Sequence, residues 1–369
     1  MKILTGIDLP FNPSCGSMIL CDDLYYTEKS NYQIKFLALN SNNLYSWSKL
    51  RDVCLIGIEK IYDPDDYHNY VLNLRDFAEG QVRKFKPDII HIQHLGFGMA
   101  LALADIENIP KIAICHGTDV LFSLKNEFHK NNLLKILNSV QCVISPTQKM
   151  LTQLLSIIPP GGVKNYEIVP WGISDLVIEN AQPRTWFQSG KYLLYAGRLA
   201  DEKNIHVLFK AITLLDENIN LTVVGDGDEK DRLKRIVDVE NLHQRIYFED
   251  FLPREELWKR FKNFDAIVIP TKEVEAFCLI AIEAQSYGLP IIHSNTGGLE
   301  EVIGDTGIIF DNEDPGDLAR KIQLLFSDTA MMNKLSRKGL QNVEKYKISN
   351  TQKRFFEISQ KIISHYNSV

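Results

Sequence analysis

Residues 266–302 contain the alternation that most constrains what this chain can fold into. They read AIVIPTKEVEAFCLIAIEAQSYGLPIIHSNTGGLEEV. A short apolar run is followed by a polar loop, a helical stretch at about 276–287, a stop containing Gly288 and Pro290, a β-branched run and a Gly-Gly turn. This order of strand, loop, helix, strand and loop is typical of a parallel α/β sheet, in which ligands bind at the carboxyl ends of the strands. We therefore predict that Glu275 and the Gly297-Gly298 turn face one cleft.

The same alternation runs through the whole chain in two arrays. Short β-branched runs predict strands in the first array at 2–7, 34–39, 53–58, 88–93, 111–115, 142–145 and 167–169, and in the second at 192–195, 221–224, 246–248, 266–269, 290–292 and 308–310. Helical stretches lie between them, for example at 18–30, 67–86, 205–215, 229–240 and 255–261. The pattern lapses at 170–190, which is typical of a linker.

We therefore expect an α/β protein made of two Rossmann-like parallel-sheet domains that face each other across a cleft. The first domain covers residues 1–172 and the second covers residues 190–345. The amphipathic tail at about 349–369 is long enough to pack back on the first domain. A length of 369 residues agrees with two domains of middling size.

Composition excludes several classes of protein. The net charge of −6 and the pI of 5.9 do not favour a nucleic acid or an anionic membrane surface as partner. Six cysteines are scattered without a C-x-x-C pair, which fits free thiols in a reducing compartment. No signal-like start and no run of eighteen apolar residues is present, so we expect a cytoplasmic protein, with a peripheral membrane contact left open.

Two glutamates frame the helix predicted at 276–287. Glu275 and Glu283 are eight residues apart, or about 12 Å along a helix, whereas the acid/base pair of a glycosidase needs roughly 5 to 9.5 Å. They are better placed to hold two ends of a polyhydroxylated ligand, while the backbone N–H groups at 276–279 offer a seat for phosphate. A nucleoside diphosphate sugar has this form. The alternative is that Glu275 only complements the helix dipole and Glu283 is a solvated surface residue.

Further candidates follow other strand ends. Arg198 and Lys203 lie five residues apart across a strand-to-helix turn, where they would neutralise a diphosphate, unless they are a solvated basic pair. The segment LTVVGDG at 221–227 is a weak match to a dinucleotide fingerprint because the third glycine is missing. His116 ends a strand and would hydrogen-bond a ligand hydroxyl or a developing charge, unless it is structural. His91 and His94 lack a third ligand, so we predict no metal site.

These pieces together resemble a known family. The chain contains GR-x4-KN at 197–204, VVGDG at 223–227, FLP at 251–253, the Glu275 and Glu283 pair, and Gly297-Gly298 followed by Glu301. The combination is similar to retaining glycosyltransferases of the GT-B fold, and more narrowly to the fourth glycosyltransferase family. The resemblance is specific over about residues 190–330 and looser in the first domain.

The resemblance implies a role for each matching position. Arg198 and Lys203 would hold the donor diphosphate, Glu275 would contact the transferred sugar, and Glu283 would accept hydrogen bonds from the ribose. His116 would reach the donor sugar from the first domain, which binds the acceptor. The remaining donor contacts would come from Gly16, Gly225, Leu252, Ala276, Phe277, Cys278 and Leu279.

Several positions depart from the family pattern. Cys15 replaces one of two glycines in the first loop, and Ala276 and Cys278 stand where glycines are common. Trp171 replaces an asparagine before the linker, and Asp250 replaces a glycine before the segment that contacts the base. None of these changes removes a charged group that the reaction needs.

The expected function is transfer of a hexosyl group from a nucleoside diphosphate sugar, with UDP as the expected nucleotide, to the hydroxyl of a small molecule or glycan. The anomeric configuration would be retained, and neither a metal nor a further cofactor would be needed. Three alternatives stay open: a sugar-nucleotide epimerase of the same fold, an NAD-dependent oxidoreductase, and a non-catalytic protein that binds nucleotide sugars. The donor sugar, the acceptor and the linkage are not encoded in any pattern that we recognise.

Overall fold

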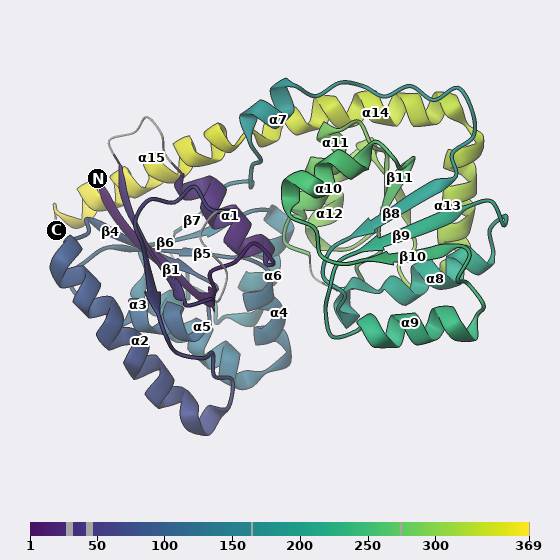
Figure 1. Ribbon diagram of the computed structural model, residues 1–369. Coiled ribbons are helices and arrows are strands. Elements are labelled where there is room, and N and C mark those ends of the chain that lie inside the picture. The colour runs from purple at the N-terminus through teal and green to yellow at the C-terminus, as the bar shows by residue number, and fades with distance from the viewer. Residues whose placement is uncertain (27–31, 42–46, 164, 274, 369) are drawn as a thin grey trace. The chain divides into compact units, whose positions relative to one another are not determined.

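The computed structural model describes residues 1–26, 32–41, 47–163, 165–273 and 275–368. It divides into two compact units (Figure 1). Unit 1 contains residues 1–172 and 348–369, and unit 2 contains residues 173–347. Each unit has its own parallel sheet.

Unit 1 is built on a seven-stranded sheet with the order β3-β2-β1-β4-β5-β6-β7, in which all paired strands are parallel. Its strands are β1 (Lys2–Pro10), β2 (Gln33–Leu39), β3 (Val53–Ile56), β4 (Ile89–Gln93), β5 (Lys111–Ile114), β6 (Cys142–Ser145) and β7 (Tyr166–Ile168). Its helices are α1 (Gly16–Tyr25), α2 (Pro64–Phe85), α3 (Gly98–Ala104), α4 (Thr118–Lys125), α5 (Glu127–Ser139), α6 (Gln148–Ile157) and α15 (Ile348–Tyr366).

Local capping explains where several of these helices begin. The side chain of Asp63 accepts a hydrogen bond from the backbone N–H of Asp65 at 3.0 Å and precedes a proline in the first turn of α2. Thr147 likewise accepts from the N–H of Met150 at 3.2 Å at the start of α6. Such caps satisfy N–H groups that have no partner inside the helix.

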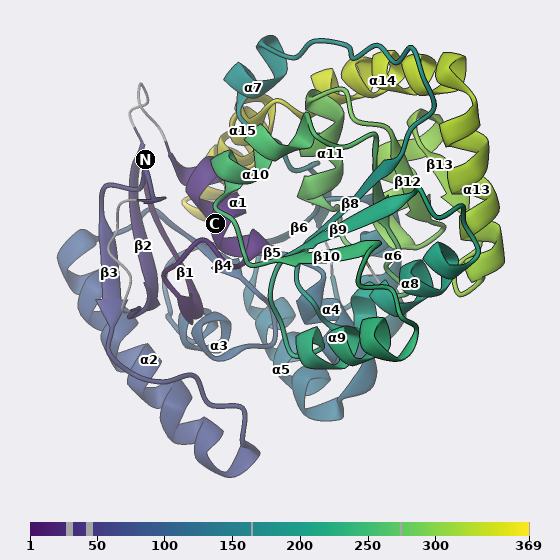
Figure 2. The same ribbon diagram turned by 45° about the vertical axis from the view of Figure 1, so that its right-hand side comes forward.

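Unit 2 is built on a six-stranded parallel sheet with the order β10-β9-β8-β11-β12-β13; β8, β9 and β10 lie side by side in Figure 2. Its strands are β8 (Tyr192–Ala196), β9 (Asn220–Val224), β10 (Ile246–Glu249), β11 (Ala266–Ile269), β12 (Ile291–Ser294) and β13 (Ile308–Phe310). Its helical segments are α7 (Asp175–Glu179), η2 (Asp201–Lys203), α8 (Ile205–Thr213), α9 (Lys230–Val239), α10 (Arg254–Phe261), α11 (Leu279–Ser286), α12 (Gly297–Ile303), η3 (Gly304–Thr306), α13 (Pro315–Ser327), α14 (Thr329–Val343) and η4 (Glu344–Tyr346).

The C-terminal helix α15 lies in unit 1, although the chain reaches it only after unit 2. The side-chain amide of Gln352 donates to the backbone carbonyls of Asp23 and Tyr26 at 2.9 and 2.8 Å. The rings of Tyr32 and Phe356 have centroids 4.2 Å apart. These contacts tie the tail to the segment that begins with α1.

Several element boundaries differ from the sequence-based predictions, and three of the differences change how a segment is understood. β1 continues to Pro10, so Asp8 belongs to a strand and is buried. α1 begins at Gly16 rather than at residue 18, and its predicted end at residue 30 lies outside the described residues. The predicted linker at 170–190 contains α7, and the indole N–H of Trp186 anchors it by donating to Asp265 at 2.8 Å. Periodicity cannot reveal such side-chain anchors.

Two glycines pack the loop after β9 against the loop after β8. A Cβ atom at Gly225 would lie 2.0 Å from the carbonyl oxygen of Gly197, and one at Gly227 would lie 2.3 Å from that of Leu199. The N–H of Leu199 donates to the carbonyl of Asp226 at 2.8 Å. Because both glycines also have positive φ, only glycine allows this close approach of two backbones.

A second glycine pair fixes the loop that carries Glu275. Gly297 has a φ of 49°, and a Cβ atom there would lie 2.8 Å from the carbonyl oxygen of Glu275. The N–H of Gly298 donates to that same oxygen at 2.7 Å, and a Cβ atom at Gly298 would lie 2.3 Å from the carbonyl of Ala276. The first turn of α12 therefore determines where the backbone of Glu275 lies.

Replacing Gly298 with alanine should damage this contact. We expect Gly298→Ala to lower the free energy of unfolding by about 3 kcal/mol, the upper end of overpacking penalties, because the clash is with backbone that cannot rotate away. Urea unfolding followed by circular dichroism measures the loss. Gly57→Ala is the control, since a Cβ atom there meets nothing within 4 Å, and it should stay within about 0.5 kcal/mol of the parent. Equal stabilities of the two variants would contradict the packing.

Candidate active site

The centre of the candidate site in unit 2 is an ion pair between Lys203 and Glu275. The ammonium nitrogen of Lys203 lies 2.5 Å from Oε2 of Glu275, and their side chains are 25% and 15% exposed. Lys203 ends η2 after β8, and Glu275 lies in the loop between β11 and α11. Strands β8 and β11 are neighbours in the sheet, so the carboxyl ends of both bring these charges together.

The surroundings keep Lys203 charged. Burial disfavours the ammonium form of Lys203, but the nearby carboxylate of Glu275 outweighs it and the pKa of Lys203 lies above its ordinary value. Lys203 therefore carries its positive charge throughout the physiological pH range. A charged, partly buried ammonium at the end of a parallel sheet is suited to bind a phosphoryl group.

Arg198 is placed differently from Lys203. Its guanidinium forms an ion pair with Glu202, four residues further along the chain, and its side chain is 59% exposed. The hydroxyl of the buried Tyr195 donates to the carbonyl of Arg198 at 2.8 Å and fixes the backbone there. The structure thus brings Lys203 to Glu275 and directs Arg198 to Glu202, a partner that the sequence analysis missed.

A set of contacts at the same sheet edge ties the loops together. Lys272 donates from its backbone N–H to the carbonyl of Glu202 at 3.0 Å and pairs through its side chain with Asp201 at 2.7 Å. The hydroxyls of Ser294 and Thr296 both donate to the carbonyl of Thr271, at 2.6 and 3.0 Å. The sequence analysis also missed these residues, although each one ends a strand or lies within six residues after one, and that position was the available signal.

The segment 276–279 does not form the start of a helix as predicted. α11 begins at Leu279, and Cys278 is its N-cap residue with a φ of 71°, in the left-handed region that favours glycine. Phe277 is buried with its ring 5.3 Å from that of Tyr346, and Ala276 is also buried. A ligand can therefore meet Ala276 and Phe277 only through their backbone.

Glu283 is buried on α11 and forms an ion pair with Arg254 on α10, with Nε 2.6 Å from Oε1. It is not a solvated surface residue, so that alternative is wrong. Leu252 lies two residues before Arg254, the first residue of α10, and is half-buried. Asp250 is 90% exposed and pairs with Lys230 at 2.7 Å.

The glycines at 225 and 227 have a structural explanation. Both glycines lie against backbone atoms of residues 197–199. In a dinucleotide-binding fingerprint, the glycines instead let the backbone approach a pyrophosphate. The packing explains the VVGDG segment without a bound dinucleotide. Gly225 itself has no side chain to offer a ligand.

In unit 1, His116 follows β5 and is half-buried. Its Nε2 atom lies 2.6 Å from Oε1 of Gln93, and its backbone N–H donates to both carboxylate oxygens of Asp119 at 3.0 and 3.2 Å. Burial lowers the pKa of His116 to about 3, so the imidazole is neutral at physiological pH. The ring of His94 lies 4.8 Å away, edge to face.

The loop after β1 contributes the start of α1. Gly16 is its first residue, Cys15 is the N-cap, and a Cβ atom at Gly16 would meet nothing within 4 Å. The next residue, Ser17, has its hydroxyl 2.8 Å from Nε2 of His94. Within unit 1, His94 therefore connects the start of α1 to His116.

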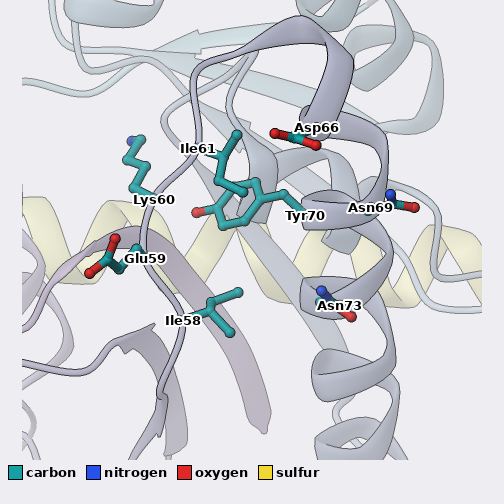
Figure 3. A pocket seen from close by; sticks show the side chains of 8 residues that line it. All are labelled: Ile58, Glu59, Lys60, Ile61, Asp66, Asn69, Tyr70 and Asn73. Atoms are coloured by element: carbon teal, nitrogen blue, oxygen red, sulfur yellow. The ribbon is translucent and has the colours of Figure 1, made fainter.

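A groove of about 400 Å³ lies beside the carboxyl end of β3, where residues 58–61 face the first turns of α2 (Figure 3). It is lined by Ile58, Glu59, Lys60, Ile61, Asp66, Asn69, Tyr70 and Asn73. Lys60 lies 3.4 Å from the buried carboxylate of Asp8, so its charge is largely compensated. Amide and carboxylate groups beside an aromatic ring are suited to a hydroxylated ligand without negative charge.

The described residues show no cluster of three or more His, Cys, Asp or Glu side chains that could hold a metal ion. In the same part of the chain, no helix is both long and apolar enough to cross a membrane. All six cysteines are free thiols. Burial, and then the charge of Glu275, raise the pKa of Cys278 above its ordinary value, which makes that thiol a poor nucleophile.

Comparison with known proteins assigns the chain to a family. The model for Glycosyl transferases group 1 matches residues 178–342, and the model for Glycosyltransferase Family 4 matches residues 41–175. A glycogen synthase of Mycobacterium tuberculosis is 27% identical over 279 residues, which cover 72% of this chain and 66% of the relative. The chain thus spans about two thirds of the length of that curated relative.

Solved structures share the fold at low sequence identity. Sucrose-phosphate synthase from Thermosynechococcus elongatus has a TM-score of 0.84 at 18% identity, covering 99% of both chains. HepE of Anabaena, solved in complex with UDP and glucose, has a TM-score of 0.78 at 16% identity, covering 97% of this chain and 99% of its own. The two family models together match most of the chain, and both sheets are parallel and Rossmann-like. This chain therefore belongs to the glycosyltransferases of the GT-B fold, within glycosyl transferases group 1.

Proposed function

We propose that this protein transfers a hexosyl group from a UDP-sugar to an acceptor hydroxyl and retains the anomeric configuration. The observation that carries the proposal is the Lys203–Glu275 ion pair at the carboxyl edge of the sheet in unit 2. The ammonium group of Lys203 is suited to bind the donor phosphates, and the carboxylate of Glu275 is suited to accept hydrogen bonds from sugar hydroxyls. UDP is favoured because HepE, which shares the fold, was solved with that nucleotide.

Breaking the donor bond leaves negative charge on the diphosphate and positive charge on the sugar ring. Lys203 stabilises the departing diphosphate, and backbone N–H groups at the start of α11 add to this stabilisation. Arg198 joins them only if its side chain leaves Glu202. Preorganised donors of this kind, in a site that excludes water, usually contribute more to the rate enhancement than any other single effect.

Glu275 has two tasks in this proposal. Without donor it keeps Lys203 charged and correctly placed, and with donor it accepts hydrogen bonds from the transferred sugar. Arg254 holds Glu283 in the same way, and in this proposal the carboxylate of Glu283 accepts from the ribose. The departing phosphate takes the proton of the acceptor hydroxyl on the same face of the sugar, which retains the configuration without a protein nucleophile.

The groove beside α2 is our candidate site for part of the acceptor. Glu59 and Asp66 add negative charge, and Lys60 is compensated by Asp8, so the groove favours a neutral hydroxylated acceptor over an anionic one. Asn69→Ala with Asn73→Ala should raise the KM for the acceptor and leave the KM for the donor unchanged. An unchanged acceptor KM would exclude the groove.

Loss of the Lys203 charge should remove both donor binding and turnover. We expect Lys203→Ala to cost about 3 kcal/mol of transition-state stabilisation, on the order of a hundredfold in rate. A thermal-shift screen of nucleoside diphosphate sugars should give a shift of several degrees with one donor for the parent protein and none for the variant. Lys210→Ala, on the exposed face of α8, is the matched control and should behave as the parent. A parent-like shift for Lys203→Ala would refute the phosphate site.

Glu283 should affect the nucleoside and not the diphosphate. We expect Glu283→Gln to weaken UDP binding about tenfold, because a hydrogen bond to a charged group becomes a neutral one. Isothermal titration of UDP and of 2′,3′-dideoxy-UDP separates the effects, since the second ligand lacks the ribose hydroxyls and should bind both proteins equally. Glu255→Gln, on the exposed side of α10, is the control. A loss of affinity that is equal for both ligands would refute the ribose contact.

A further inference from the structure

His116 stands at the end of a buried chain of hydrogen bonds in unit 1. Oε1 of Gln93 lies 2.6 Å from Nε2 of His116. The amide nitrogen of the same Gln93 donates to the hydroxyl of Tyr25 at 2.6 Å and to that of Thr5 at 3.1 Å. Gln93, Tyr25 and Thr5 are all buried.

The orientation of the Gln93 amide follows from the bond that Thr5 already makes. The Thr5 hydroxyl donates its proton to the backbone carbonyl of His91 at 2.9 Å, so towards Gln93 its oxygen can only accept. Gln93 must therefore present its NH₂ group to Thr5 and its carbonyl oxygen to His116. The reversed amide would place two acceptors 3.1 Å apart in a buried site.

The donors and acceptors in the rest of this hydrogen-bond series can be assigned in the same way. The hydroxyl of Ser359 donates its proton to the carbonyl of Phe355 at 2.7 Å, so Nε2 of His91 donates to Ser359 at 2.9 Å. Burial keeps His91 neutral by lowering its pKa, so Nδ1 has the lone pair and accepts the proton of Tyr25 at 2.9 Å. Each N–H or O–H group in this series of hydrogen bonds has one acceptor, and the series ends at Ser359 and Phe355 on α15.

This direction determines the tautomer of His116. Because Oε1 of Gln93 only accepts, Nε2 of His116 carries the proton and Nδ1 has a free lone pair. Within the described part of the chain, Nδ1 has no hydrogen-bond partner. His116 is half-buried, so a ligand can reach this atom.

We propose that Gln93 is a positioning residue, which holds His116 as the Nε2–H tautomer so that Nδ1 accepts a hydrogen bond from a hydroxyl of the ligand. The role of the ligand as a sugar rests on the proposed function. Of the two roles predicted for His116, the geometry thus selects recognition of a hydroxyl, because an unprotonated Nδ1 cannot donate to a developing negative charge.

The titratable groups that face His116 come from three elements. His94 lies in the loop after β4, with its ring 4.8 Å away and Nε2 at the hydroxyl of Ser17. Asp119 on α4 uses both carboxylate oxygens on backbone N–H groups, among them that of His116. Tyr25 on α1 acts through Gln93. No carboxylate in the described residues is bonded to the imidazole, which agrees with its neutral state.

The tautomer can be measured without any substrate. Selective ¹⁵N labelling of the histidine rings, with His116→Asn to assign the signal, should show a protonated Nε2 and an unprotonated Nδ1 in the parent protein. Gln93→Leu should mix or reverse the tautomers, because the acceptor at Nε2 is lost. A protonated Nδ1 in the parent protein would overturn the proposal, whatever the enzyme transfers.

The pH profile tests the consequence for the reaction. Gln93→Glu keeps an acceptor at Nε2 but adds a negative charge that raises the pKa of His116. As the pH falls through that new pKa, Nδ1 gains a proton and can no longer accept. We expect kcat/KM of Gln93→Glu to fall about tenfold between pH 8 and pH 5.5 relative to the parent, with near-parent activity at pH 8, whereas Gln93→Leu should lose about tenfold at every pH.

Gln141→Glu is the matched control, because Gln141 accepts from the N–H of Lys111 at the opposite, amino end of the same sheet. It should keep the parent pH profile. Parent-like kinetics for Gln93→Leu, or a Gln93→Glu profile equal to that of Gln141→Glu, would overturn the proposal. If no donor is turned over by any of these proteins, the proposed function fails while the ring measurement still decides the tautomer.

Discussion

The close contact between the first turn of α12 and the backbone of Glu275 is the constraint on which the candidate donor site depends. Glu275 lies in the loop between β11 and α11, and the N–H of Gly298 donates to its backbone carbonyl at 2.7 Å. That contact sets where the carboxylate meets Lys203, and the carboxylate in turn keeps the ammonium charged. One added Cβ atom at Gly297 or Gly298 would therefore affect the charge balance of the site through the backbone geometry.

Ion pairing in the ligand-free site has a consequence for binding. Lys203 with Glu275 and Glu283 with Arg254 are both partly or fully buried, and an unpaired charge at these positions would be costly. A donor offers a phosphate to Lys203 and hydroxyls to Glu275 while Arg254 stays with Glu283, so none of these charges is left unpaired. The same pairs disfavour ligands that carry phosphate without hydroxyls, because Glu275 would then lose its cation and gain nothing.

Sequence patterns were enough to place nearly every strand, since β-branched runs in a buried parallel sheet are distinctive. The strand at 142–145 was predicted to the residue, and the helix at 276–287 was wrong at its start because Cys278 takes a left-handed conformation that periodicity does not encode. The positions of Lys203 and Glu275 after the ends of strands could be predicted from the sequence, and the structure brings the two side chains together. The pairs Arg198–Glu202 and Glu283–Arg254 could not, because the direction in which each side chain points depends on the folded loops and not on the spacing of charges in the sequence.

The neutrality of His116 also fits the charge that develops in the proposed reaction. The sugar ring gains positive charge as its bond to the diphosphate breaks, so a cationic imidazole in contact with it would oppose the reaction. Burial and the Gln93 amide keep the ring neutral, whereas a carboxylate in place of that amide would favour the imidazolium. The amide oxygen of Gln93 is a neutral acceptor, so it orients the ring without charging it. In the proposed reaction, the cation of Lys203 is therefore suited to contact the phosphates, and the neutral imidazole of His116 is suited to contact the sugar.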